Sequence, residues 1–372
     1  MDAPKERRFF LKSLLGCLAF GGASVFTSKK CLINLAGKLT SSFPGRAEAI
    51  EATGKKDTAK IDVFTHIAPK KYVDSLQKYS PNAIVNQALW DLDQRFRMMD
   101  QLGDIKQILT LVSPPIENIP DLTKSADLAK TANDGIAELI TRYPDRFAAG
   151  TASLPMSDMD SNIKELERAI RDLGLKGVQV YTSVKGKPLD SPEFMPLYEK
   201  MAAYDLPIWI HPISHENHPF YPSDQGSKND FDNTIGWPHA TSMAMMRLAS
   251  SGILEKFPNL RFITHHSGGT IPYLAKRIEF APSGSGAVSR PLIESLRLFY
   301  CDTAVQGNTP NLMCANAFCG TDHQLFGTDF PMADVSMVQR VIRSIDEMEI
   351  TDKQRQMIFG DNVKKILGII KT

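Results

Sequence analysis

The sequence lacks an apolar run long enough to cross a bilayer. The stretch from Leu14 to Phe26 has only 13 residues, whereas a helix that spans the hydrocarbon core needs about 20. The five cysteines also give no disulfide framework, because two precede residue 50 and the other three form an odd set without C-x-x-C spacing. These absences argue against a multi-span membrane protein and against a small disulfide-stabilised scaffold.

The chain has almost no net charge, at +1 over 372 residues. The first 49 residues hold eight Lys or Arg against three Asp or Glu, so the remainder carries 35 basic and 39 acidic residues and a charge of −4. A mildly acidic body without a Lys/Arg stripe excludes nucleic acid as the expected partner. The length suits one (β/α)8 barrel of roughly 250 residues or more with an N-terminal extension.

A motif near the N-terminus predicts export. Arg7 and Arg8, followed by residues 9–12 and the short apolar stretch, resemble a twin-arginine signal of the form R-R-x-F-L-K. The resemblance implies a leader over residues 1–49, passage through the twin-arginine export machinery and a periplasmic or other extracytoplasmic location. Ala47 to Ala49 form an A-x-A cleavage site, which places the catalytic domain at residues 50–372. The alternative is an amphipathic or disordered tail in which two arginines adjoin by chance.

After Lys56 the pattern alternates between short β-branched runs and longer helical stretches, which predicts an α/β fold with parallel strands, a (β/α)8 TIM barrel. The expected strands are Ile61–His66, Ile105–Val112, Ala148–Ser153, Gly177–Thr182, Pro207–His211, Arg261–His265, Leu298–Asp302 and Gln324–Thr328. The expected helices are Leu122–Tyr143, Met159–Leu173, Glu193–Tyr204, Thr241–Phe257 and Val335–Glu347. His215 to Trp237 has weak periodicity and predicts a long loop over the barrel mouth.

Metal-binding side chains recur where these strands end. His66 ends the first strand, His211 the fifth and His265 with His266 the sixth, while Asp329 follows the eighth. A single histidine at a strand end is more often a hydrogen-bonded core residue than a ligand. Imidazoles and a carboxylate that converge on the active-site face of a barrel are, however, the donors that Zn²⁺ or a similar divalent ion requires. Their joint placement predicts a metal site.

These residues lie within a longer resemblance. The chain looks like the amidohydrolase-related family that includes aminocarboxymuconate semialdehyde decarboxylase, over residues 61 to about 370. The resemblance implies that His66, His211 and Asp329 bind a divalent metal, Zn²⁺ or else Mn²⁺, and that His266 with Asp329 transfers protons. It also implies a homodimer. The matching stretches are Ile61–Pro69, Trp90–Gly103, Leu175–Thr182, Pro188–Pro192, Pro207–Pro212, Ser251–Pro258, His266–Pro272, Gly327–Pro331 and Gly360–Asn362.

The first departure from the family pattern is at the metal site. The H-x-H motif of the first strand reads Phe64, Thr65, His66, so one expected ligand is missing. Strand alternation places Asp62 on the same face as Phe64 and His66, although deeper in the barrel. Three protein ligands and a water still make a workable catalytic zinc site.

The second departure concerns substrate binding. The decarboxylase branch is expected to carry a carboxylate-binding arginine seven residues before Trp90, where this chain has Ala83. Trp90, Arg95 and Arg97 are therefore the candidates for substrate contact, with solvated helix charges as the alternative for both arginines.

The resemblance favours a metal-dependent carboxy-lyase, a non-oxidative decarboxylase of a small aromatic or unsaturated carboxylate. The same site could hydrolyse a lactone, ester or amide, because a bound metal can activate water as well as polarise a carboxylate. A third possibility is a non-catalytic exported binding protein with a degenerate metal site, motivated by Phe64 and Ala83.

Overall fold

The computed structural model describes residues 59–80, 86–213, 229–280 and 288–369. All of them belong to one compact unit, Lys56–Thr372. The predicted leader, its twin-arginine motif and Ala83 lie outside the described residues. Among those that are described, no helix is both long and apolar enough to span a membrane.

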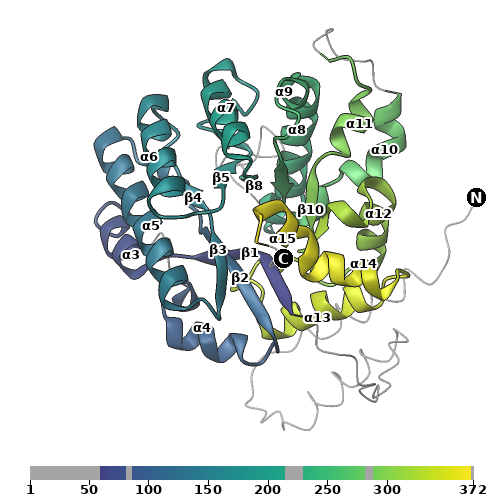
Figure 1. The fold of residues 1–372 in the computed structure, drawn as a ribbon, viewed down its shortest axis with the longest axis horizontal. Helices are drawn as coiled ribbons and strands as arrows, with labels where there is room; N and C mark the ends of the chain where they lie inside the picture. The colour runs from purple at the N-terminus through teal and green to yellow at the C-terminus, as the bar shows by residue number, and fades with distance from the viewer. Residues whose placement is uncertain (1–58, 81–85, 214–228, 281–287, 370–372) are drawn as a thin grey trace, which may run out of the picture. The chain divides into compact units, whose positions relative to one another are not determined.

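The strands pair in parallel and follow the chain around a ring (Figure 1). β3 and β4 are separated only by Thr151 and connect two sheets, of order β1-β2-β3 and β4-β5-β8-β9-β10-β11. The Val63 amide donates to the Phe326 carbonyl at 2.8 Å, and the Asp329 amide donates to the Phe64 carbonyl at 2.9 Å. The predicted parallel α/β fold is confirmed, and these two bonds join the first strand to the segment that follows β11. The parallel strands are β1 Lys60–Ile67, β2 Ile105–Leu111, β3 Phe147–Gly150, β4 Ala152–Ser153, β5 Val178–Tyr181, β8 Ile208–His211, β9 Phe262–Thr264, β10 Tyr300–Asp302 and β11 Gln324–Leu325.

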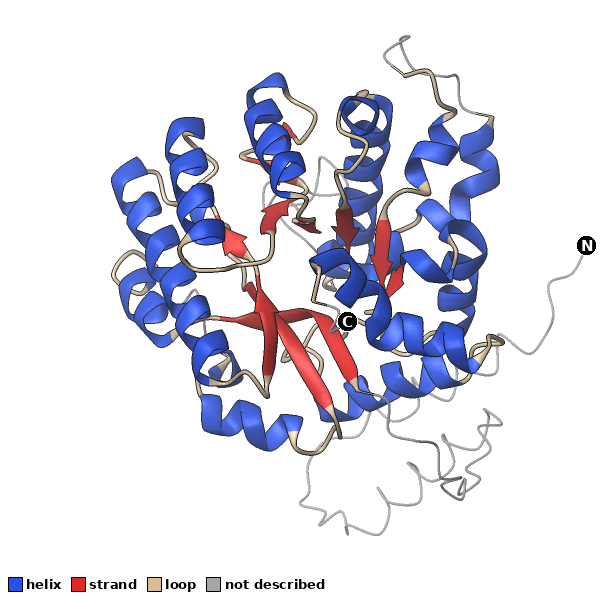
Figure 2. Ribbon diagram, viewed as in Figure 1, coloured by secondary structure: helices blue, strands red, loops and turns tan. Residues whose placement is uncertain are grey.

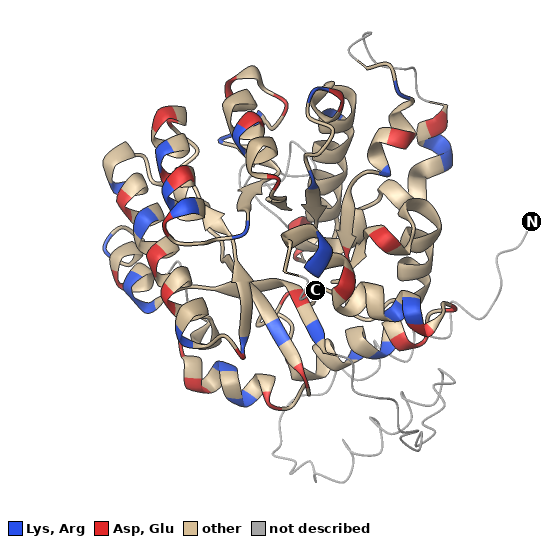
Figure 3. Cartoon of the chain, viewed as in Figure 1, with Lys and Arg blue, Asp and Glu red and all other residues tan. Residues whose placement is uncertain are grey.

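Helices surround the strands (Figure 2), and Lys, Arg, Asp and Glu of both signs concentrate on them (Figure 3). An antiparallel hairpin of β6 Ser183–Val184 and β7 Lys187–Pro188 follows β5. The α-helices are α3 Lys70–Leu76, α4 Leu92–Met99, α5 Leu122–Arg142, α6 Met159–Arg171, α7 Met195–Tyr204, α8 Trp237–Ser250, α9 Ile253–Lys256, α10 Ile271–Glu279, α11 Leu292–Leu296, α12 Thr309–Cys319, α13 Val335–Asp346, α14 Asp352–Gln356 and α15 Asn362–Leu367. The short 3-10 and π segments are η1 Gln87–Leu89, η2 Ile116–Asn118, η3 Pro192–Phe194, η4 Asp232–Gly236, η5 His266–Gly268, η6 Thr321–His323 and η7 Met357–Asp361.

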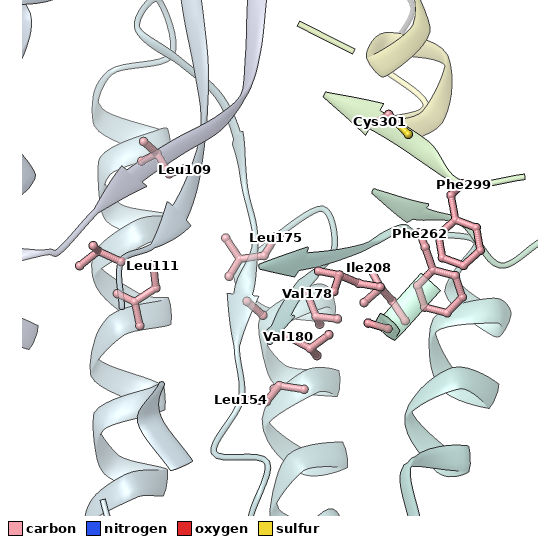
Figure 4. Packing of buried hydrophobic residues seen from close by; sticks show 14 of the residues in the cluster. Leu109, Leu111, Leu154, Leu175, Val178, Val180, Ile208, Phe262, Phe299 and Cys301 are labelled. Carbon is pink, nitrogen blue, oxygen red and sulfur yellow. The ribbon is translucent and has the colours of Figure 1, made fainter. Parts of the chain in front are cut away.

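Two buried clusters hold the fold together. The larger cluster lies where strands meet helices, and its side chains from neighbouring strands pack side by side in Figure 4. The smaller cluster takes residues from successive strands, among them Ile61, Ile108, Trp209, Ile263 and Leu325. Such layers of alternate inward-facing residues fill the interior of a barrel of this kind. This layer is apolar, and the candidate site residues lie beyond it at the carboxyl ends of the strands.

Two predicted elements differ from the structure. The helix expected over Thr241–Phe257 is wrong as a single element, because Gly252 with φ +82° ends α8 and opens α9. The loop expected over His215–Trp237 is wrong at its end, because π-helical turns from Asp232 lead directly into α8 at Trp237. Residues 214–228 of that expected loop lie outside the described part of the chain.

A β-bulge interrupts the first strand between Asp62 and Thr65. The Phe64 amide and the Thr328 amide both donate to Asp62 Oδ1 at 3.1 Å. The simple alternation that placed Asp62 with Phe64 and His66 is therefore broken, as is typical of a bulge. The side chain of Asp62 therefore joins the first strand to the segment after β11 through its hydrogen bonds to Phe64 and Thr328.

Candidate metal centre

His66 is held with one ring nitrogen ready to bind a metal. Its Nδ1 lies 3.4 Å from Thr110 Oγ1, and that hydroxyl donates to the Thr65 carbonyl at 3.1 Å. Because the hydroxyl proton is already used, Thr110 accepts from His66 Nδ1–H, and the lone pair falls on Nε2. The neighbouring strand thus sets the tautomer of His66.

His211, at the end of β8, is arranged in the same way. Its Nδ1 donates to the Pro212 carbonyl at 2.6 Å, which leaves Nε2 as an acceptor. Burial, together with the neighbouring histidines, lowers the pKa of His211 well below its ordinary value of 6.5. A neutral imidazole is the form that ligates a metal.

Three donor atoms converge at His66 Nε2. It lies 3.3 Å from His211 Nε2 and 3.2 Å from Asp329 Oδ1. Ligands at about 2.0 to 2.1 Å in a tetrahedral shell are about 3.3 Å apart, so the spacing fits a shared divalent ion. Two lone pairs and a carboxylate oxygen this close repel one another unless a cation lies among them. The two imidazoles and the carboxylate therefore fit a metal.

The described residues contain no group of three or more His, Cys, Asp or Glu side chains with the geometry of a preformed metal cluster. The candidate metal site is therefore inferred from two contacts of His66, one with His211 and one with Asp329. The metal roles expected from the sequence stay predictions, but the structure does bring the three residues together.

The sixth strand supplies two histidines with different surroundings. His265 is fully buried, and its Nδ1 donates to Asp302 Oδ2 at 2.7 Å. His266 is half-buried, adopts the left-handed φ of +55°, and its buried Nδ1 has no hydrogen-bond partner. A partly exposed imidazole at the edge of the site can exchange protons with a bound molecule, which is the role predicted for His266.

Phe64 fills the space among the histidines. Its ring is fully buried and stacks on His265 with centroids 3.6 Å apart at 15°. It also meets His66 at 4.9 Å and His211 at 5.6 Å. The His66 and His211 rings are themselves 5.1 Å apart. The distances from Phe64 to His66 and His211 are thus close to the distance between those two candidate ligands, whereas His265 lies nearer to Phe64.

Trp237 forms a wall of the site that the sequence analysis missed. Its ring lies 5.6 Å from His211 and 6.2 Å from His266. Gly269 lets the η5 turn approach this wall, since a Cβ there would fall 2.3 Å from the Pro238 carbonyl oxygen. The pair Trp237-Pro238 was an available signal, because proline is favoured in the first turn of a helix. This pair predicts that a helix begins at Trp237, which places the tryptophan after the fifth strand and near the carboxyl ends of the strands.

The three substrate-binding candidates lie at different places. Arg95 is fully buried and donates from Nη1 to the His66 carbonyl at 2.7 Å and from Nε to Gln107 Oε1 at 2.9 Å. Arg97 is exposed on α4, and Trp90 lies beneath the Lys70 ammonium, 5.5 Å from it. Arg95 therefore supports the backbone of His66, and a substrate contact by any of the three stays a prediction.

Glu117 is a buried acidic residue whose ionisation can be tested. Burial raises its pKa to about 7 from 4.5, so the folded protein holds a proton that the unfolded chain releases. Stability from this group is present below pH 4.5 and is lost as the pH rises through about 7. Relative to Glu117→Gln, the wild type should lose about 3 kcal/mol between pH 4.5 and 7. Urea denaturation of both proteins at pH 5 and pH 8 measures this difference.

Glu138→Gln is the control for that measurement, because it makes the same substitution at an exposed glutamate. A constant difference between Glu117→Gln and the wild type at the two pH values would mean that Glu117 is ionised in the folded protein.

Parallel strands whose carboxyl ends carry two imidazoles and a carboxylate are typical of metal-dependent α/β enzymes. Comparison with known proteins gives the family. Residues 61–369 match the amidohydrolase family, so the chain belongs to it. The predicted membership is confirmed, and the chain is an enzyme of that superfamily.

The chain is similar to decarboxylases over most of its length. It is 31% identical to a gamma-resorcylate decarboxylase of Polaromonas sp., covering 74% of this chain and 87% of that protein. It is 29% identical to a 2-amino-3-carboxymuconate-6-semialdehyde decarboxylase of Dictyostelium discoideum, covering 83% and 92%. A solved dihydroxybenzoic acid decarboxylase from Polaromonas sp., with bound manganese and the inhibitor 2-nitroresorcinol, is 26% identical with a TM-score of 0.70 over 85% of this chain and 98% of that one. None of these likenesses bears on the export signal or the homodimer, which stay predictions.

Proposed function

We propose that this enzyme is a divalent metal-dependent, non-oxidative decarboxylase of a small aromatic or unsaturated carboxylate. The observation that carries the proposal is the convergence of His66 Nε2, His211 Nε2 and Asp329 Oδ1 at 3.2 to 3.3 Å. The decarboxylases that the chain resembles support the substrate class.

The metal would be Zn²⁺ or Mn²⁺, held by His66, His211 and Asp329. Two imidazole nitrogens and a carboxylate oxygen suit both ions, and a similar decarboxylase holds manganese. When bound, a divalent ion supplies positive charge that attracts an anionic substrate and stabilises developing negative charge.

The chain's own residues would orient the substrate and move the proton. The flat rings of Phe64 and Trp237 offer apolar walls to a planar molecule and keep water from the reacting carbon. As the bond between that carbon and the carboxylate breaks, CO2 departs and the electron pair stays on the substrate carbon. A proton from His266 then replaces the carboxylate, so that the reaction needs no oxidant or reductant.

The test is a screen of hydroxybenzoate-type and muconate-type carboxylates with protein reconstituted with Zn²⁺ or Mn²⁺, in which CO2 release and ring opening are followed together. We expect CO2 release that stops on chelation and returns with metal. Hydrolysis of lactones or esters without CO2 release would replace the proposal with a hydrolase. Failure to retain a stoichiometric metal, with no turnover, would indicate a binding protein.

We also propose that the enzyme is exported through the twin-arginine machinery. The support is the match of Arg7, Arg8 and residues 9–12 to the signal pattern. Changing both arginines to lysine should leave the enzyme active but retain it inside the cell. Fractionation of cells that express either form, with Lys29 and Lys30 both changed to arginine as control, measures the change. Unchanged export of the double-lysine form would contradict the proposed signal.

A further inference from the structure

His265 occupies the same level of the barrel as the candidate ligand His211. β8 and β9 are neighbouring parallel strands, and Trp209 is paired in register with Ile263. Both of these residues belong to the interior cluster, so the residues two positions further along, His211 and His265, continue on the inward face. Their ring centroids are 5.7 Å apart. The two imidazoles are thus side by side at the carboxyl ends of adjacent strands.

The free nitrogen of His265 has no partner in the described structure. Asp302, at the end of β10, accepts from Nδ1 at 2.7 Å, which fixes the tautomer and leaves the lone pair on Nε2. The side chain is fully buried, and Nε2 makes no hydrogen bond. A buried acceptor without a partner is unfavourable, because it has given up its hydrogen bond to water and gained none in return. An imidazole oriented by a carboxylate with its other nitrogen open is the arrangement that metal-binding histidines adopt.

Phe64 covers the face of the His265 ring and not the edge that carries this nitrogen. Its ring lies flat against the face of His265, with an interplanar angle of 15°. Stacking covers the face of an imidazole, whereas a metal binds in the plane of the ring at its edge. Phe64, which stands in place of the expected first-strand ligand, therefore packs directly on His265.

We propose that His265 Nε2 is a further protein ligand of the divalent ion, in place of the imidazole that Phe64 does not supply. This inference rests on the proposed metal site of His66, His211 and Asp329, and it leaves proton transfer to His266. Asp302 then acts as a positioning residue, because it holds the His265 ring through Nδ1.

The test is Mn²⁺ binding by His265→Gln, measured by equilibrium dialysis with detection by electron paramagnetic resonance. Glutamine keeps the volume of the side chain and can still donate to Asp302. We expect Mn²⁺ affinity to fall about 10- to 100-fold. His323→Gln, which removes the imidazole stacked on Tyr300 away from the site, is the matched control and should bind like the wild type.

A second measurement does not depend on the variant folding. Pulsed electron paramagnetic resonance of the Mn²⁺-loaded wild type, labelled with ¹⁵N-histidine, counts the coordinated imidazoles. We expect three, and a count of two would overturn the role of His265, as would unchanged affinity in a folded His265→Gln. His211→Ala separates the two proposals: if it loses Mn²⁺ while His265→Gln does not, only the present inference fails. If neither variant changes Mn²⁺ binding, the metal does not bind at the proposed site of His66, His211 and Asp329, and both proposals fail.

Discussion

His211→Ala should lose bound metal and turnover together, whereas His266→Asn should keep the metal and lose turnover alone. His211 Nε2 lies 3.3 Å from His66 Nε2 inside the candidate shell, so its removal should weaken metal binding by more than about 100-fold. Loss of a proton-transfer group typically lowers the rate about 10²- to 10⁴-fold. Asparagine is chosen at 266 because it tolerates the left-handed backbone found there. Metal content after dialysis and the rate of CO2 release measure the two effects.

The exposed His239→Asn serves as the control for both variants, with denaturation curves to establish that each one folds. If His266→Asn loses the metal as well, His266 is a ligand and the division of roles given above is wrong. If His211→Ala retains stoichiometric metal, the site does not include His211.

Phe64→His should raise metal affinity by about tenfold or more, which is about 1.4 kcal/mol. The Phe64 ring lies 4.9 Å from His66 and 5.6 Å from His211, and those two rings are 5.1 Å apart. An imidazole at 64 would therefore stand at ligand separation from both. The gain should be larger in a His265→Gln background, where the site lacks that imidazole. Equilibrium dialysis against Zn²⁺ and Mn²⁺ measures the affinity, and steady-state rates show whether loss of the apolar wall lowers turnover.

Phe64→Leu is the matched control, since it keeps an apolar side chain without a donor atom and should not change affinity. Equal affinities of the histidine and leucine variants would mean that position 64 does not face the ion, whatever its distance from the other rings.

The sequence was sufficient to predict the parallel α/β fold because its signals are local. The expected strands are short, mostly apolar runs between helical stretches, and each appears in the structure within a few residues of its predicted bounds. The break between α8 and α9 was less visible, although Gly252 marks it. The bulge between Asp62 and Thr65 could not be predicted, because it depends on hydrogen bonds from Thr328, which is distant in sequence.

The candidate site was predictable in its residues but not in its surroundings. His66 and His211 lie at the carboxyl ends of strands and Asp329 follows one, so strand ends alone indicate that they meet. Arg95 seemed as available to a substrate as Arg97, and only tertiary packing shows that one donates to the His66 carbonyl while the other is exposed. The contact of Trp237 with His211 depends on how α8 meets the barrel, which periodicity does not give.

The backbone at His266 and Asp329 has a consequence for the evolution of this protein. Both residues adopt positive φ, at +55° and +69°, where a side chain other than glycine costs about 1–3 kcal/mol. Glycine at either position would relieve that cost but would also remove a side chain that is proposed to bind the metal or transfer the proton, so selection for heat resistance would oppose selection for turnover there. Thermostable descendants that keep turnover must therefore gain their stability elsewhere, on the outer helices.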